Sequence, residues 1–65
     1  MKDNKGAIKD FNIAITLDSK LGMVYFDRAS AYYEMDDLNP ACSDWNKASD
    51  LGVVEASYFI KEYCQ

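Results

Sequence analysis

The chain repeats part of itself at an interval of 34 residues, and this feature constrains its fold more than any other. Of the 17 positions that the shift aligns, seven carry the same residue, and Phe11 falls on Trp45. The identical pairs are Met1 with Met35, Asp3 with Asp37, Ala7 with Ala41, Asp10 with Asp44, Asn12 with Asn46, Ala14 with Ala48 and Leu17 with Leu51. Self-similarity at a fixed interval predicts one structural unit that recurs and stacks on its neighbour.

The segment from Tyr25 to Leu51 reads as two amphipathic helices joined by a polar turn. Apolar residues recur there at spacings of three and four, which places them on one face of each helix. They are Tyr25, Ala29 and Tyr32 in the first helix, and Ala41, Trp45, Ala48 and Leu51 in the second. Between them, Asp37 is a good N-cap, and Pro40 would occupy the third helical position, where its missing N–H costs little. The pattern predicts an antiparallel hairpin in which alanines face aromatic rings.

The same spacing extends to both ends of the chain and predicts four helices, over about 3–17, 20–35, 38–51 and 53–63. Asp3 is the expected N-cap of the first helix, and Asp18-Ser19 of the second. Gly52 suits the left-handed position that follows a helix. We therefore expect an all-α fold of antiparallel hairpins in one unit, 1–65. Residues 1–18 would be the second helix of an incomplete repeat, 19–52 a complete repeat, and 53–65 a C-terminal capping helix.

The pattern resembles the tetratricopeptide repeat, a 34-residue helix-turn-helix unit of α-solenoids. The matching residues are Tyr25, Ala29, Ala31, Tyr32 and Tyr33 in the first helix and Ala41, Trp45 and Ala48 in the second. Two positions depart from it, because Arg28 replaces a usual leucine and Val53 replaces a common proline. The segment 41–60 also resembles Sel1-type repeats, which rank second because their spacing is longer and variable.

The resemblance implies a non-catalytic scaffold that binds a protein or peptide in a groove lined by the first helix of each repeat. Carried over by position, the groove residues here are Met23, Phe26, Ser30, Tyr33 and Glu34. None is the lysine, arginine or asparagine with which this family clamps a carboxylate, so apolar or aromatic ligand groups are expected. Two alternatives stay open: these aromatics pack only against neighbouring repeats, or the chain is a purely structural capping or dimerisation segment of a longer helical-repeat protein.

The side chains of that helix should differ in exposure, because they lie on different sides of it. Phe26 and Tyr33 are expected to be accessible to solvent. Tyr25 and Tyr32, together with Phe11 and Trp45, are expected between the helices.

The first helix carries an apolar stripe formed by Ala7, Phe11 and Ala14. In the repeat alignment this helix lacks its own partner, so either the chain is part of a longer array or something else covers the stripe. Burying one phenylalanine contributes roughly 1.5–3 kcal/mol. We therefore expect self-association into a homo-oligomer through these three residues.

Cys42 and Cys64 lie at similar distances from the turn between the third and fourth helices. In an antiparallel pair they should therefore stand at nearly the same level along the helix axes. One hypothesis is that both are small buried hydrophobic residues. The other is a disulfide, which needs a close crossing of the two helices. Alanines at 41, 48 and 56 would permit such a crossing. Oxidation in the cell would need an oxidising compartment, which the sequence does not establish.

Residues that carry catalytic chemistry are scarce, so we expect neither an enzyme nor a bound metal or cofactor. The chain has no histidine, which excludes Ser-His and Cys-His nucleophiles. Asp36, Asp37 and Asn39 lack the remainder of a calcium loop. The net charge of -4 disfavours nucleic acid as a partner. No apolar run approaches the roughly 20 residues of a membrane span, so insertion by this segment is not expected.

Overall fold

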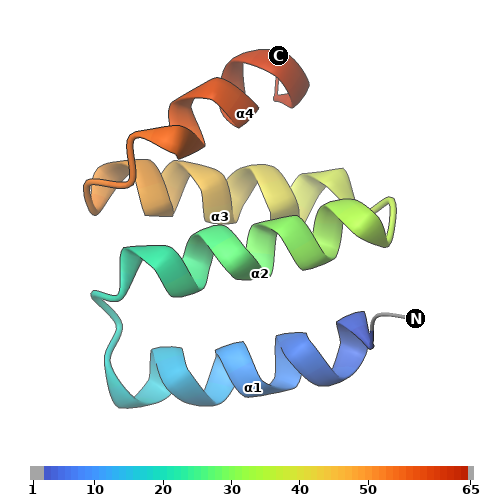
Figure 1. Cartoon of the computed structure of the whole chain (residues 1–65), viewed down its shortest axis with the longest axis vertical. Helices are drawn as coiled ribbons and strands as arrows, with labels where there is room; N and C mark the ends of the chain where they lie inside the picture. The colour runs from blue at the N-terminus through green and yellow to red at the C-terminus, as the bar shows by residue number, and fades with distance from the viewer. Residues whose placement is uncertain (1–2, 65) are drawn as a thin grey trace.

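The structure, a computed structural model, describes residues 3–64, which contain four helices and no strand (Figure 1). The helices are α1 (Asn4–Leu17), α2 (Gly22–Glu34), α3 (Leu38–Asp50) and α4 (Glu55–Tyr63). Each runs antiparallel to the one before it, with α1 at one edge of the stack and α4, tilted, at the other (Figure 1). Packing is concentrated between consecutive helices. The predicted all-α arrangement of hairpins is confirmed; the first pair of the repeat alignment, at Met1, lies outside the described residues.

The helix ends follow the sequence signals in part. Asp3 caps α1, since its side chain accepts a hydrogen bond from the Gly6 N–H at 2.9 Å. Gly52 follows α3 with a φ of 98°, a left-handed conformation that glycine adopts without steric strain. Asp37 stands at the N-cap position of α3, but its side chain makes no capping hydrogen bond.

The prediction that Asp18-Ser19 caps the second helix was wrong. The N-cap position of α2 is Leu21, which offers no side-chain acceptor. The Asp18 carboxylate instead accepts a hydrogen bond from the backbone N–H of Lys20 at 3.0 Å. A short aspartate side chain reaches its own backbone two residues later, and this local turn competes with capping.

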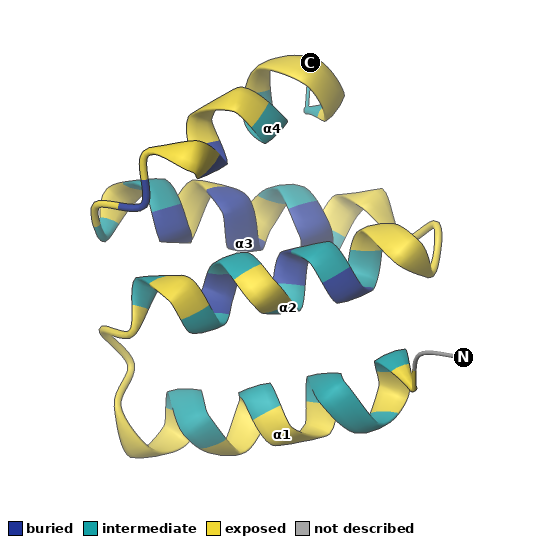
Figure 2. Cartoon of the chain, in the orientation of Figure 1, coloured by how far each residue is buried: buried dark blue, intermediate teal, exposed yellow. Residues whose placement is uncertain are grey.

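Most of the buried residues lie on α2 and α3 (Figure 2), and the core cluster combines several alanines with Trp45 and Tyr25. Trp45 is fully buried, and so are Ala29, Ala41 and Ala48. The alanines let the helix backbones approach closely, and the indole of Trp45 packs against aromatic rings of α2 and α4. Tyr25 is also buried, and its hydroxyl donates to the Ser19 carbonyl at 3.0 Å. By contrast, α1 contributes half-buried residues but none that is fully buried.

Candidate functional site

The five predicted groove residues all lie on α2, and we call them the α2 surface: Met23, Phe26, Ser30, Tyr33 and Glu34. Met23 is 54% exposed and Tyr33 39% exposed. Phe26 and Ser30 are half-buried, and Glu34 is exposed. On the other sides of the helix, Tyr25 is buried as expected, while Tyr32 is half-buried against the core. The α2 surface is therefore partly open to solvent.

Aromatic side chains of α4 cover one margin of the α2 surface. The Phe26 ring meets the Phe59 ring edge to face, with centroids 5.4 Å apart. The Tyr33 ring lies 4.8 Å from that of Tyr63. Beneath both pairs, Trp45 stacks on Phe59 at 5.2 Å. Such ring pairs stabilise beyond their buried area. They fix the position of Phe26 and Tyr33 at this margin.

A depression of about 250 Å³ opens at the other margin, between α1 and α2. Its lining residues are Asn4, Ala7, Phe11, Asp27, Ser30, Ala31 and Glu34. Ala7, Phe11 and Ala31 supply apolar surface, whereas Asp27 and Glu34 supply carboxylates. The structure thus divides the predicted groove residues, because Phe26 and Tyr33 pack toward α4 while Ser30 and Glu34 border this depression.

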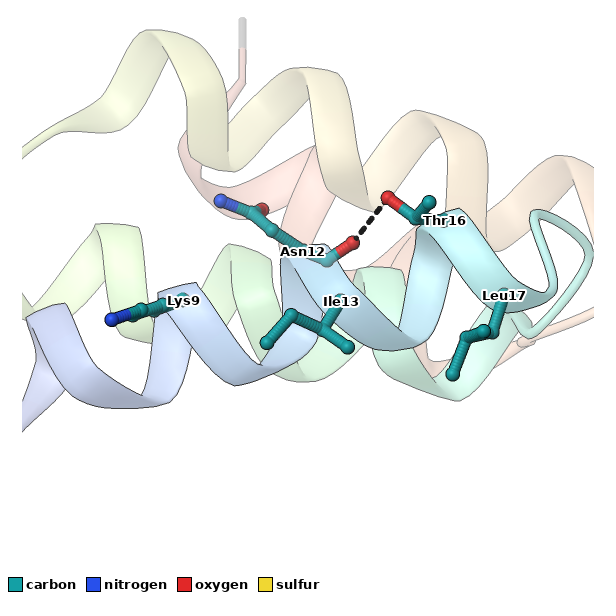
Figure 3. A pocket seen from close by; sticks show the side chains of 5 residues that line it. All are labelled: Lys9, Asn12, Ile13, Thr16 and Leu17. Atoms are coloured by element: carbon teal, nitrogen blue, oxygen red, sulfur yellow. Dashed lines mark hydrogen bonds between the residues drawn. The ribbon is translucent and has the colours of Figure 1, made fainter.

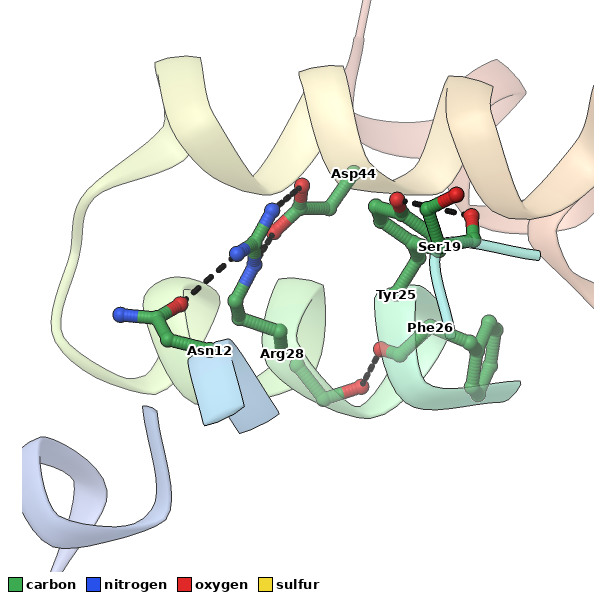
Figure 4. A network of polar contacts seen from close by, with 7 residues as sticks. Asn12, Ser19, Tyr25, Phe26, Arg28 and Asp44 are labelled. Carbon is green, nitrogen blue, oxygen red and sulfur yellow. Dashed lines mark hydrogen bonds and ion pairs between the residues drawn. The ribbon is translucent and has the colours of Figure 1, made fainter. Parts of the chain in front are cut away.

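Arg28 links three helices through its guanidinium group (Figure 4). Its Nε and Nη2 donate to the two carboxylate oxygens of Asp44 in α3, each at 2.7 Å. Its Nη1 donates to Oδ1 of Asn12 in α1 at 2.8 Å. The hydrogen bond with Asp44 raises the pKa of Arg28 above its ordinary value, against the opposing effect of burial. A two-pronged pair of this kind fixes geometry as well as charge.

Sequence reasoning did not find the Arg28–Asp44 pair, although both residues carried a signal. Arg28 stood out as a departure from the leucine usual at its position in the repeat. Asp44 lies beside the apolar stripe of the third helix, and it is only 5% exposed. A buried carboxylate needs a partner. Arg28 was the candidate partner, because it lies in the helix that was expected to pack on that stripe.

Cys42 and Cys64 are joined by a disulfide that ties the C-terminal end of α4 to the start of α3. Their Cα atoms are 5.7 Å apart, closer than the usual separation of neighbouring helix axes. Ala41, Ala48 and Ala56 are all fully buried nearby in the core cluster. Small side chains along this contact allow the close approach.

The N-terminal stripe is partly covered. Ala7, Phe11 and Ala14 are all half-buried, and Phe11 borders the depression that α1 shares with α2. Larger apolar side chains are more exposed elsewhere on α1, with Ile13 at 54% and Leu17 at 82%. They line a second depression, of about 310 Å³, with Lys9, Asn12 and Thr16 (Figure 3). The most exposed apolar surface of α1 is thus not the predicted stripe, and self-association through that stripe stays a prediction.

None of the helices in 3–64 is long and apolar enough to cross a membrane. The same part of the chain holds no group of three histidine, cysteine, aspartate or glutamate side chains placed to bind a metal ion.

Comparison of the chain with protein-family models, with curated proteins and with solved structures returned no match.

Proposed function

We propose that this chain is a non-catalytic interaction scaffold of the tetratricopeptide-repeat type, which binds a peptide segment along the α2 surface. The observation that carries the proposal is the depression between α1 and α2, because apolar side chains of both helices line it together with two carboxylates. Consecutive antiparallel helices and the 34-residue repeat support the same view. Concave apolar sites with a few polar groups are the usual places for ligands.

The chemistry of the depression indicates what the ligand should carry. Apolar surface from Ala7, Phe11 and Ala31 favours an aliphatic or aromatic side chain. Asp27 is exposed at the rim and favours a positively charged neighbour on the ligand. We therefore propose a peptide in which an apolar residue stands next to lysine or arginine.

Selection from a library of displayed random 12-residue peptides tests this proposal. Wild-type protein should enrich peptides with an apolar residue next to a basic one. Fluorescence anisotropy then measures the Kd of an enriched peptide for the variant Ser30→Arg, which adds bulk and positive charge at the depression. We expect binding to weaken at least about tenfold, which corresponds to about 1.4 kcal/mol.

The matched control is Ser43→Arg, which makes the same replacement at an exposed position of α3. It should leave the Kd unchanged, because it alters net charge equally but lies away from the depression. Equal weakening by both variants would point to a general charge effect. Selection of peptides without any common pattern would count against binding at α2.

A structural role is the second candidate, and the disulfide together with the aromatic packing of α4 favours it. In this view the segment caps or dimerises a longer helical-repeat protein and binds no ligand. Terminal units of repeat arrays close the stack with a helix whose outer face is polar and exposed to solvent. α4 fits that description in part, since Ala56 is buried while the charged side chains of Glu55 and Glu62 are exposed. The peptide selection separates the two candidates, because a pure cap would enrich nothing.

A further inference from the structure

The α3 helix is covered on two sides by different helices. On one side Asp44 receives the guanidinium of Arg28 from α2. On the other side Cys42 is bonded to Cys64 at the end of α4, and the Ser49 and Ser57 hydroxyls lie 3.5 Å apart. These contacts define two faces of α3, one for the helix before it and one for the helix after it.

The 34-residue alignment transfers both faces onto α1. The face toward the following helix corresponds to Ile8, Phe11 and Ile15 on α1. All three are half-buried, Phe11 borders α2 residues in the shared depression, and Ile15 packs against the core cluster. α1 therefore faces α2 with the same repeat positions that α3 turns toward α4.

The other face of α1 has no helix over it in the described part of the chain. Asp10 and Leu17 are the counterparts of Asp44 and Leu51. Leu17 is 82% exposed, whereas Leu51 is half-buried; Asp10 is exposed, whereas Asp44 is buried. Ile13 and Ala14 complete this surface, which we call the Asp10 face: Asp10, Ile13, Ala14 and Leu17. Figure 3 looks onto Ile13 and Leu17, which extend from α1 without another helix in front of them.

Charge indicates what a helix that covers this face should carry. Asp44 is matched by an arginine of the helix that covers it, and within residues 3–64 no ion pair joins Asp10 to a cation. Asp10 stands among apolar residues at the equivalent place. A carboxylate that becomes buried there would need a cation from the covering helix. Ala14, like its buried counterpart Ala48, leaves room for a close approach.

We propose that the Asp10 face docks an amphipathic helix with the pattern of α2, which offers an arginine to Asp10. In α2 that pattern places Tyr25 three residues before Arg28 and Ala29 directly after it. A second copy of this chain is the less favoured occupant, because its own Arg28 is already paired with Asp44. This surface is separate from the peptide site proposed on α2.

A synthetic peptide with the sequence of residues 21–36 is the probe, because it carries the pattern with its arginine. Binding to the intact chain is followed by fluorescence anisotropy and by the methyl NMR signals of Ile13 and Leu17. We expect those two signals to shift. The replacement Asp10→Arg should weaken the affinity at least tenfold, and the peptide with Arg28→Asp should bind this variant but not the wild type.

The control variant is Asp50→Arg, which makes the same charge change at an exposed position of α3. Equal loss of affinity in Asp10→Arg and Asp50→Arg would overturn the proposal, and so would failure of the charge exchange to restore binding. Shifts confined to core methyl groups such as Val53 would show that the peptide displaces α2, which also overturns it. Sedimentation that shows dimers dependent on Leu17 but indifferent to Asp10 would make a second copy the occupant instead.

Discussion

Arg28 contacts polar side chains of both neighbouring helices, so the loss of either partner should have a measurable effect. The Asp44 side chain is 7% exposed and that of Arg28 is 20% exposed. We expect Asp44→Asn to lower the free energy of unfolding by about 2 kcal/mol, since it leaves the half-buried guanidinium without its counter-charge. Urea denaturation measures this change.

The control for that experiment is Asp10→Asn, the same replacement at the equivalent but exposed position of the repeat. It should change stability by less than about 0.5 kcal/mol. Replacing Arg28 and Asp44 together by leucine should recover much of the loss, because no unpaired charge remains. A loss as large at Asp10 as at Asp44 would show that burial of the pair is not the cause.

Tyr33 should titrate above the ordinary tyrosine range. Its hydrogen bond with Tyr63, followed by electrostatic repulsion between the two and by desolvation, raises its pKa above 10.0. The raised pKa belongs to the folded state, so this bond stabilises the fold below pH 10 and is lost as the pH rises through the folded pKa. We expect Tyr63→Phe to lower the pKa of Tyr33 in an NMR titration, while Tyr58→Phe leaves it unchanged. An unchanged value in the first variant would contradict the pairing.

At the scale of the helices, the disulfide should decide whether α4 stays packed. α4 has nine residues, and a helix of that length is marginal in water without tertiary contacts. Cys42 and Cys64 are 22 residues apart in sequence, and closing a loop of that size contributes about 3 kcal/mol in the chain-entropy model. The double replacement by serine should lower the melting temperature and increase hydrogen exchange in α4 more than in α2.

Reductant provides the control for the cysteine prediction. It should lower the melting temperature of the wild type but leave that of the double serine variant unchanged. Two thiols that stay free under mild oxidant, with no change in melting, would leave both cysteines as ordinary packing residues.

The helices could be predicted because their signals are local. Apolar residues recur along one face, Asp3 lies three residues before Gly6, and Gly52 ends a helix. The Arg28–Asp44 pair could not be predicted from local signals. Its partners are 16 residues apart, and their pairing depends on how α2 and α3 are rotated about their axes relative to each other. Phe26 was expected to be accessible to solvent, but its ring packs against Phe59. That contact depends on the tilt of α4, which no local sequence pattern determines.

For the molecule as a whole, the helices form one thin layer with principal-axis extents of 27 × 26 × 17 Å. Both faces of such a layer meet solvent, so few side chains can be fully buried. Within residues 3–64, five of the eight buried hydrophobic residues are alanines: Ala29, Ala31, Ala41, Ala48 and Ala56. Trp45 and Tyr25 are therefore the two largest side chains among the buried residues.

This layered arrangement predicts that the helices do not unfold together. α1 has no fully buried residue, and the hydrogen bond from Arg28 to Asn12 is a polar link between it and α2. Stacked repeats open from their ends, where a helix has one neighbour. In native-state hydrogen exchange, the amides of α1 should open at a lower free energy than those of α3. Uniform protection across both helices would show a single cooperative unit instead.

The disulfide also makes the second half of the molecule a covalent ring, which holds the α3–α4 turn between Cys42 and Cys64. A protease that cuts once inside this ring, for example trypsin after Lys47, opens the polypeptide without releasing either piece. On a non-reducing gel the nicked chain would migrate with the uncut one, and only reductant would separate the two fragments. Integrity judged without reductant would therefore overlook cleavage between the two cysteines.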